Sequence, residues 1–107
     1  MDTAVLGLGL IGGSVLRALA GAGHRVSGYD ADPATRTLAR AAASGAPAAA
    51  RWQVDDTVGD AVAGAALVLV AVPLPALPTV LDEIVTSGYH GIVTDVTSVK
   101  GAVRDVV

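Results

Sequence analysis

The chain of 107 residues is long enough for one domain, and its 52% of hydrophobic residues with only 3% aromatics predicts a core of Val, Leu, Ile and Ala. A net charge of −3 without any basic run argues against nucleic acid or an anionic membrane surface as a partner. The sequence has no Cys, so we expect neither disulfides nor a metal site. It also has no unbroken apolar stretch of roughly 18 residues, so we expect a cytoplasmic protein without membrane spans.

Two kinds of apolar pattern alternate along the chain. Short apolar runs bounded by Gly or Pro predict strands, and apolar residues at helical spacing predict the helices between them. The predicted strands are residues 4–6, 25–29, 50–53, 66–72 and 91–94. The predicted helices cover residues 10–22, 33–43, 58–63, 77–85 and 97–107. Strict alternation with right-handed crossovers predicts an α/β fold with a doubly wound parallel sheet.

Two of these helices carry an apolar stripe that should face the sheet. In the first helix, Ile11, Val15 and Leu19 share one side. In the fourth helix, the residues that share one side are Leu77, Val80, Leu81, Ile84 and Val85. The start of the second helix is marked by Asp32 as the expected N-cap and Pro33 at the first helical position.

A glycine motif joins the first strand to the first helix. The sequence GLGLIG at residues 7–12 lies between an apolar strand and an amphipathic helix, the context that strengthens this fingerprint. Gly7 permits a tight turn, Gly9 lets the backbone approach a pyrophosphate, and Gly12 allows helix and strand to pack closely. We therefore predict a Rossmann-type dinucleotide-binding domain over residues 1–107. The alternative is a glycine-rich turn that binds nothing. The predicted cofactor contacts in the motif are Gly7, Gly9, Leu10, Ile11 and Gly12.

An acidic residue ends the second strand. Asp30 lies near the offset at which such folds place a carboxylate on the adenine ribose. A carboxylate there accepts hydrogen bonds from the ribose hydroxyls and repels a 2′-phosphate. Arg36 could reach a 2′-phosphate, but we expect it on a solvated helix face. The predicted cofactor is therefore NAD rather than NADP, and a turn or capping role is the alternative for Asp30.

Three segments together resemble one enzyme family. The glycine motif continues as Gly13 and Ser14, AVP at residues 71–73 closes the fourth strand, and TDVTSVK at residues 94–100 follows the fifth. This set is similar to the prephenate and arogenate dehydrogenases of tyrosine biosynthesis, and the resemblance covers residues 3–107. The Asp-x-x-Ser-Val-Lys part of the third segment is the most particular to that family.

The resemblance implies an activity and several roles. The reaction would be the oxidative decarboxylation of prephenate or arogenate, with a hydride passing to NAD. Ser98 would be catalytic, lying beside the nicotinamide and orienting the substrate hydroxyl. Capping of the last helix is the other interpretation of Ser98, although Thr97 could equally supply that cap. Val72 and Pro73 would line the nicotinamide-ribose side of the cleft, where packing alone would also explain them.

The sequence departs from this family in one large respect. The family's catalytic base is a His in a His-Pro segment downstream of the Ser-Val-Lys motif, and neither His24 nor His90 matches that segment. The helical domain that completes the substrate pocket and the homodimer interface in the family is also absent. We therefore expect the nucleotide-binding half of such an enzyme, inactive alone.

Two other interpretations stay open. Another β-hydroxyacid-type dehydrogenase could carry a similar glycine motif, although that leaves residues 94–100 unexplained. A stand-alone NAD(H)-binding or sensing module without catalysis fits the length of the chain. An open reading frame past the last codon would favour the truncated enzyme, and a stop codon would favour the module.

Overall fold

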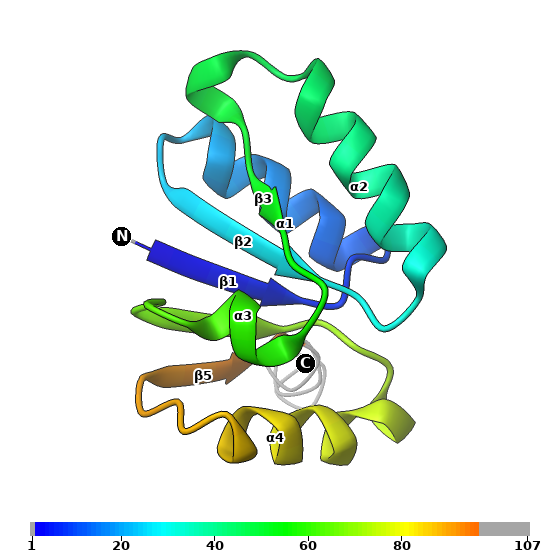
Figure 1. Ribbon diagram of the computed structural model, residues 1–107, viewed down its shortest axis with the longest axis vertical. Helices are drawn as coiled ribbons and strands as arrows, with labels where there is room; N and C mark the ends of the chain where they lie inside the picture. The colour runs from blue at the N-terminus through cyan, green and yellow to red at the C-terminus, as the bar shows by residue number, and fades with distance from the viewer. Residues whose placement is uncertain (1, 97–107) are drawn as a thin grey trace, which may run out of the picture.

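The computed structural model describes residues 2–96, and within them five parallel strands form a single sheet (Figure 1). The strands are β1 (Asp2–Leu6), β2 (Arg25–Tyr29), β3 (Gln53–Val54), β4 (Leu67–Val70) and β5 (Ile92–Asp95). Their order across the sheet is β3-β2-β1-β4-β5, so β1 lies in the middle. The chain first winds outward through β2 and β3, then crosses back to add β4 and β5. This topology confirms the predicted doubly wound α/β fold of the Rossmann type.

Helices cover both faces of the sheet (Figure 1). They are α1 (Leu10–Gly21), α2 (Pro33–Gly45), α3 (Val58–Val62) and α4 (Leu77–Thr86), with single 3₁₀ turns η1 (Ala48–Ala50) and η2 (Leu74–Ala76). The residues of α1 and α2 pack in one hydrophobic cluster, and those of α3 and α4 pack in another. No helix within residues 2–96 has the length and hydropathy that crossing a membrane requires.

Successive residues of β1 serve the two opposite faces. Val5 packs with Leu16 of α1 on one face, whereas Ala4 and Leu6 pack with Val62 of α3 on the other. All three β1 residues are almost completely buried. Strands of a parallel sheet are covered on both faces, which explains why the strand residues form continuous apolar runs rather than alternating with polar ones.

The first helix is rotated from the expected orientation. Its buried residues are Gly12, Leu16 and Ala20, whereas Ile11 is exposed. The reason is Gly12, where the helix approaches the strand most closely. Residues four and eight positions later lie on the same side of a helix, so Leu16 and Ala20 face the sheet as well. Val15 and Leu19 still pack against the core as predicted, so the predicted stripe was offset by about one residue and wrong at Ile11.

The third strand and the fourth helix also differ from the prediction. The third strand begins at Gln53 rather than at residue 50, because the 3₁₀ turn η1 occupies residues 48–50. On α4 only Ile84 is fully buried, whereas Val85 is 76% exposed, so the predicted apolar stripe was too wide. The predicted helix over residues 97–107 lies outside the described residues.

Candidate functional site

The carboxyl ends of four strands line up at one edge of the sheet. Leu6 is in register with Tyr29 on one side and with Val70 on the other, and Val70 is in register with Asp95. The segments that follow these residues therefore begin side by side. In open α/β sheets, ligands bind at this edge, where the strand order reverses. Here the reversal falls between β1 and β4, next to the glycine motif.

Gly7 and Gly12 are both required by the path of the backbone. Gly7 has a φ of +98°, a conformation that side chains disfavour. A Cβ there would also lie 2.6 Å from the carbonyl oxygen of Ala71, which follows β4. A Cβ on Gly12 would collide with the carbonyl oxygen of Gly7. The motif thus packs α1 directly onto the end of β1 and onto the neighbouring end of β4.

Gly9 differs, because no atom outside its immediate neighbours lies within 4 Å of the position of a Cβ. It is the N-cap of α1, and no side chain caps this helix or places an acid in its first turn. By contrast, Asp32 caps α2 and Thr57 caps α3. The first N–H groups of a helix lack partners within the helix and attract anions. Open space and an uncapped helix therefore coincide at Gly9, an arrangement that fits the pyrophosphate of a dinucleotide.

Asp30 reaches back to the glycine motif. Its Oδ2 accepts a hydrogen bond from the N–H of Leu8 at 2.8 Å, and its Oδ1 accepts one from the N–H of Asp32 at 2.9 Å. Asp32 itself caps α2 by accepting from the N–H of Ala34, as predicted. Each carboxylate oxygen has a second lone pair, so the held carboxylate keeps acceptor capacity for a hydroxyl group.

Arg36 is not on a solvated helix face, and that expectation was wrong. Its side chain is 15% exposed and lies against the ring of Tyr29, with 5.6 Å between the guanidinium carbon and the ring centroid. It donates to the carbonyl oxygen of Asp30 at 2.8 Å and to Asp56 at 3.2 Å. The missed signal is that a residue on the first turn of α2 points back toward the end of β2, where main-chain carbonyls are available.

The remaining predicted site residues fall into two groups. Val72 lies against the glycine turn, since its Cγ1 is 2.9 Å from where a Cβ of Gly7 would stand. Pro73 is exposed and precedes η2. Both directly follow the end of β4, and their roles at the cofactor stay predictions. Ser98 lies outside the described residues, although Asp95 ends β5 at this same edge of the sheet.

The sequence also matches a known family of oxidoreductases. The family model described as NADP oxidoreductase, coenzyme F420-dependent, matches residues 2–98. The chain belongs to this family. It is therefore an NAD(P)-binding Rossmann domain of an oxidoreductase. No curated protein sequence matches the chain significantly.

Solved structures similar to this oxidoreductase domain come from several kinds of enzyme. A protein assigned as a prephenate dehydrogenase from Corynebacterium glutamicum is 31% identical, with a TM-score of 0.72 over 97% of this chain and 32% of its own. Arogenate dehydrogenase from Synechocystis is 22% identical, with a TM-score of 0.74 over 90% and 32%. An imine reductase from Myxococcus stipitatus, solved with NADP⁺, is 18% identical, with a TM-score of 0.70 over 89% and 31%. The chain spans about a third of the length of each.

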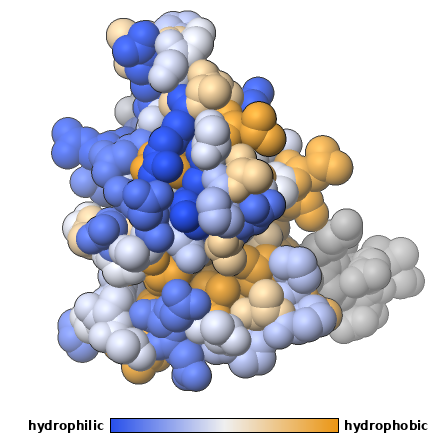
Figure 2. Space-filling view, turned by 45° about the vertical axis from the view of Figure 1, so that its right-hand side comes forward, coloured by the Kyte–Doolittle hydropathy of each residue, from blue (hydrophilic) through white to orange (hydrophobic). Residues whose placement is uncertain are grey.

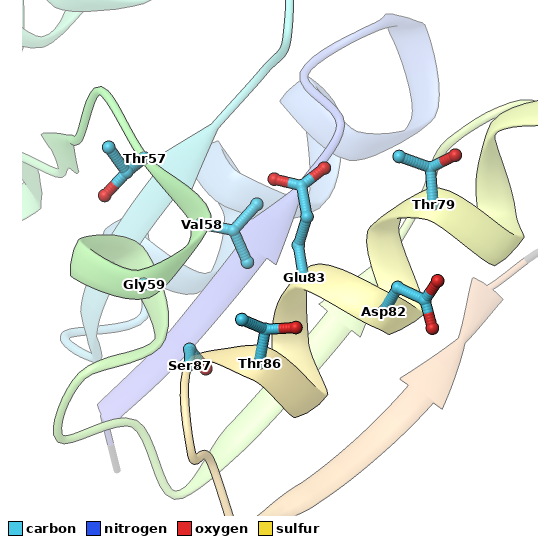
Figure 3. A pocket seen from close by; sticks show the side chains of 8 residues that line it. All are labelled: Thr57, Val58, Gly59, Thr79, Asp82, Glu83, Thr86 and Ser87. Carbon is cyan, nitrogen blue, oxygen red and sulfur yellow. The ribbon is translucent and has the colours of Figure 1, made fainter.

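The oxidoreductase domain has a hollow between α3 and α4 (Figure 3). Its lining comprises Thr57, Val58, Gly59, Thr79, Asp82, Glu83, Thr86 and Ser87. None of these residues belongs to the glycine motif or its neighbours. Two carboxylates line the hollow and no Lys or Arg does, so it is unsuited to the phosphates of a dinucleotide.

Proposed function

We propose that this chain binds NAD at the glycine turn and forms the nucleotide-binding part of a dehydrogenase that acts on prephenate or arogenate. The observation that carries the dinucleotide site is the open, uncapped start of α1 at Gly9, which directly follows Leu8, whose N–H donates to the carboxylate of Asp30. The N–H groups of Leu10 and Ile11 would hold the pyrophosphate there, with Gly7 and Gly12 fixing the turn.

The choice of NAD over NADP follows from two residues. The Asp30 carboxylate would accept hydrogen bonds from the ribose hydroxyls and repel a 2′-phosphate. Arg36, whose guanidinium group lies at the turn between β2 and α2, is already bonded to Asp56 and to the main chain of that turn. The family description names NADP, so the proposal of NAD rests on these two residues of this chain.

The proposed substrate class rests on two sequence similarities. The segment TDVTSVK at residues 94–100 resembles the prephenate and arogenate dehydrogenases. A protein assigned as a prephenate dehydrogenase also shares 31% identity over nearly the whole chain. In this proposal Ser98 orients the substrate hydroxyl as it loses its proton, and NAD, when bound, supplies the hydride acceptor.

The surroundings of the glycine turn suit the nicotinamide end of the cofactor. Val72 and Pro73 would border the ribose next to the nicotinamide, by shape and by main-chain contact.

Hydrophobic residues are also exposed near this turn. Leu10 is 90% exposed at the start of α1, and Leu74 is exposed in η2. Figure 2 shows hydrophobic residues across the middle of one face, between more hydrophilic areas above and below. The resemblance implies a substrate-binding domain and a second subunit, and these would pack against such hydrophobic surfaces in the proposed enzyme.

Titration calorimetry of the chain with NAD⁺ and NADP⁺ tests the cofactor proposal directly. We expect NAD⁺ to bind more tightly, and the pure chain to convert neither prephenate nor arogenate. Tighter binding of NADP⁺ would contradict the role given to Asp30. Turnover by the chain alone would show that the catalytic base lies within these residues. An assay of the full reading frame with both substrates tests the substrate class.

A further inference from the structure

The guanidinium group of Arg36 is held on three sides. It donates to the carbonyl oxygens of Asp30 and Ala31 at 2.8 and 3.4 Å, through the same nitrogen. Its Nε donates to Oδ1 of Asp56 at 3.2 Å, and its flat face lies near the ring of Tyr29. These contacts leave the side chain only 15% exposed.

Asp56 comes from a different part of the fold. It follows β3 and precedes α3, at the same edge of the sheet as the end of β2. Oδ1 of Asp56 also accepts from Arg40, one helical turn beyond Arg36, at 2.6 Å. That hydrogen bond is the main cause that lowers the pKa of Asp56, and the charge of Arg36 adds to it. Asp56 is therefore ionised at neutral pH and can hold both arginines.

We propose that Asp56 is a specificity-determining residue, which holds Arg36 against the β2–α2 turn and so withholds it from the 2′-phosphate of NADP. The inference rests on the dinucleotide site proposed above. Two features would then select NAD together. Asp30 repels the 2′-phosphate, and Asp56 keeps occupied the cation that could compensate for that repulsion.

The geometry explains why neither residue suffices alone. Arg36 donates to the main-chain oxygen of Asp30. Its guanidinium group therefore lies close to the place where the Asp30 carboxylate would hold the ribose. Only the bond to Asp56 engages Nε and ties the group to another element. Without that carboxylate, the guanidinium group can rotate toward a phosphate, which it binds well through parallel N–H groups. The full gain in NADP⁺ affinity therefore appears only when the repulsion by Asp30 is removed as well.

A double-mutant cycle tests this coupling. Calorimetric dissociation constants for NAD⁺ and NADP⁺ are measured for the wild type, Asp30→Ser, Asp56→Asn and the double variant. We expect the second substitution to tighten NADP⁺ binding in the Asp30→Ser background by about tenfold more than it does alone, the order of one added charge-assisted hydrogen bond. The affinity for NAD⁺ should change less than about threefold across the Asp56 substitution.

Two controls separate this effect from a general change of charge. Asp82→Asn removes the same charge from the exposed face of α4 and should raise NADP⁺ affinity only slightly. Adding Arg36→Met to the double variant should abolish the gain, because the gain is assigned to that guanidinium group. Thermal melting of each variant confirms folding, and Asp56→Ser replaces Asp56→Asn if the latter does not fold.

The outcomes distinguish the two proposals. If the wild type binds NAD⁺ but the two substitutions act independently on NADP⁺, the role of Asp56 is overturned and the dinucleotide site stands. A gain that survives Arg36→Met also overturns it. If the wild type binds neither dinucleotide, the proposed site fails and this inference fails with it. Coupling that depends on Arg36 supports the inference.

Discussion

Two glycines of the motif, Gly9 and Gly12, perform different tasks, and the structure separates them. Gly12 has no room for a side chain because the carbonyl oxygen of Gly7 lies where its Cβ would be. Gly9 has open space on that side. One glycine is therefore required for folding, and the other is required only if a ligand approaches the backbone. Substitutions at the two positions should have opposite signatures.

Replacing Gly9 with Val should remove cofactor binding without unfolding the protein. The new side chain occupies the space proposed for the pyrophosphate, so we expect NAD⁺ affinity to fall by roughly a hundredfold or more. The melting temperature should change little. Calorimetry and thermal melting measure the two quantities, and unchanged affinity in a folded Gly9→Val variant would remove the glycine turn from the site.

Gly12→Ala should do the reverse and destabilise the fold. Even one methyl group must push α1 away from the end of β1, and overpacking of this kind costs about 1–3 kcal/mol or more. Urea unfolding of the variant measures that loss. A stability equal to that of the wild type would mean that α1 can shift freely from β1.

At the scale of elements, α2 is attached mainly by polar contacts. Ala43 is its only fully buried residue. Its N-terminus is capped by Asp32, Arg36 and Arg40 both reach Asp56, and Trp52 donates from Nε1 to the carbonyl oxygen of Ala39 at 3.1 Å. The attachment of this helix should therefore depend on pH more than that of a helix held by apolar burial.

The pH dependence should follow from Asp56. Its pKa lies below the ordinary Asp value, chiefly because of the hydrogen bond from Arg40. A lowered carboxyl pKa adds stability that is fully present above the ordinary value of about 3.9 and is lost as pH falls through the lowered value. Urea unfolding at about pH 7 should therefore show Asp56→Asn to be less stable than the wild type. The difference should shrink at about pH 2.5. Because Asp56 is largely exposed, the effect should be small and should weaken with salt. An equal difference at both pH values would contradict the assignment.

At the scale of the whole molecule, β1 holds the two hydrophobic clusters together. Leu6 belongs to the cluster that α3 and α4 cover, and its neighbour Val5 belongs to the cluster that α1 covers. The strand therefore serves both halves of the core. It also ends at the glycine turn, so the stability of the core and the position of the site depend on the same five residues, Asp2–Leu6.

Truncating Leu6 should test this central role. Leu6 is 1% exposed, and Leu→Ala at such sites costs about 2–5 kcal/mol through lost burial and a residual cavity. Leu38→Ala provides the matched control, because Leu38 is 72% exposed on α2 and should change stability by less than about 0.5 kcal/mol. Urea unfolding of both variants measures the contrast, and similar losses would contradict the assigned core.

More of the fold than of the candidate site could be predicted from the sequence. Apolar runs such as the one over β4 and the glycine motif predict strands and their order of winding, because local pattern and crossover handedness leave few alternatives. The rotation of α1 was missed, since it depends on where Gly12 touches the strand. The setting of Arg36 was missed because its partner Asp56 is 20 residues away in the sequence. Contacts between distant side chains leave no local pattern.

Glycine-rich segments are commonly assumed to be mobile, yet the turn of this protein is fixed by hydrogen bonds. Gly7 donates to the carbonyl oxygen of Tyr29, Leu8 donates to Asp30, and Gly13 donates to Gly9, all within 2.8 Å. Most of the loss of conformational freedom at this turn thus occurs during folding. A ligand would meet an ordered surface, and the amide hydrogens of Gly7 and Leu8 should exchange with solvent as slowly as those of the neighbouring strands.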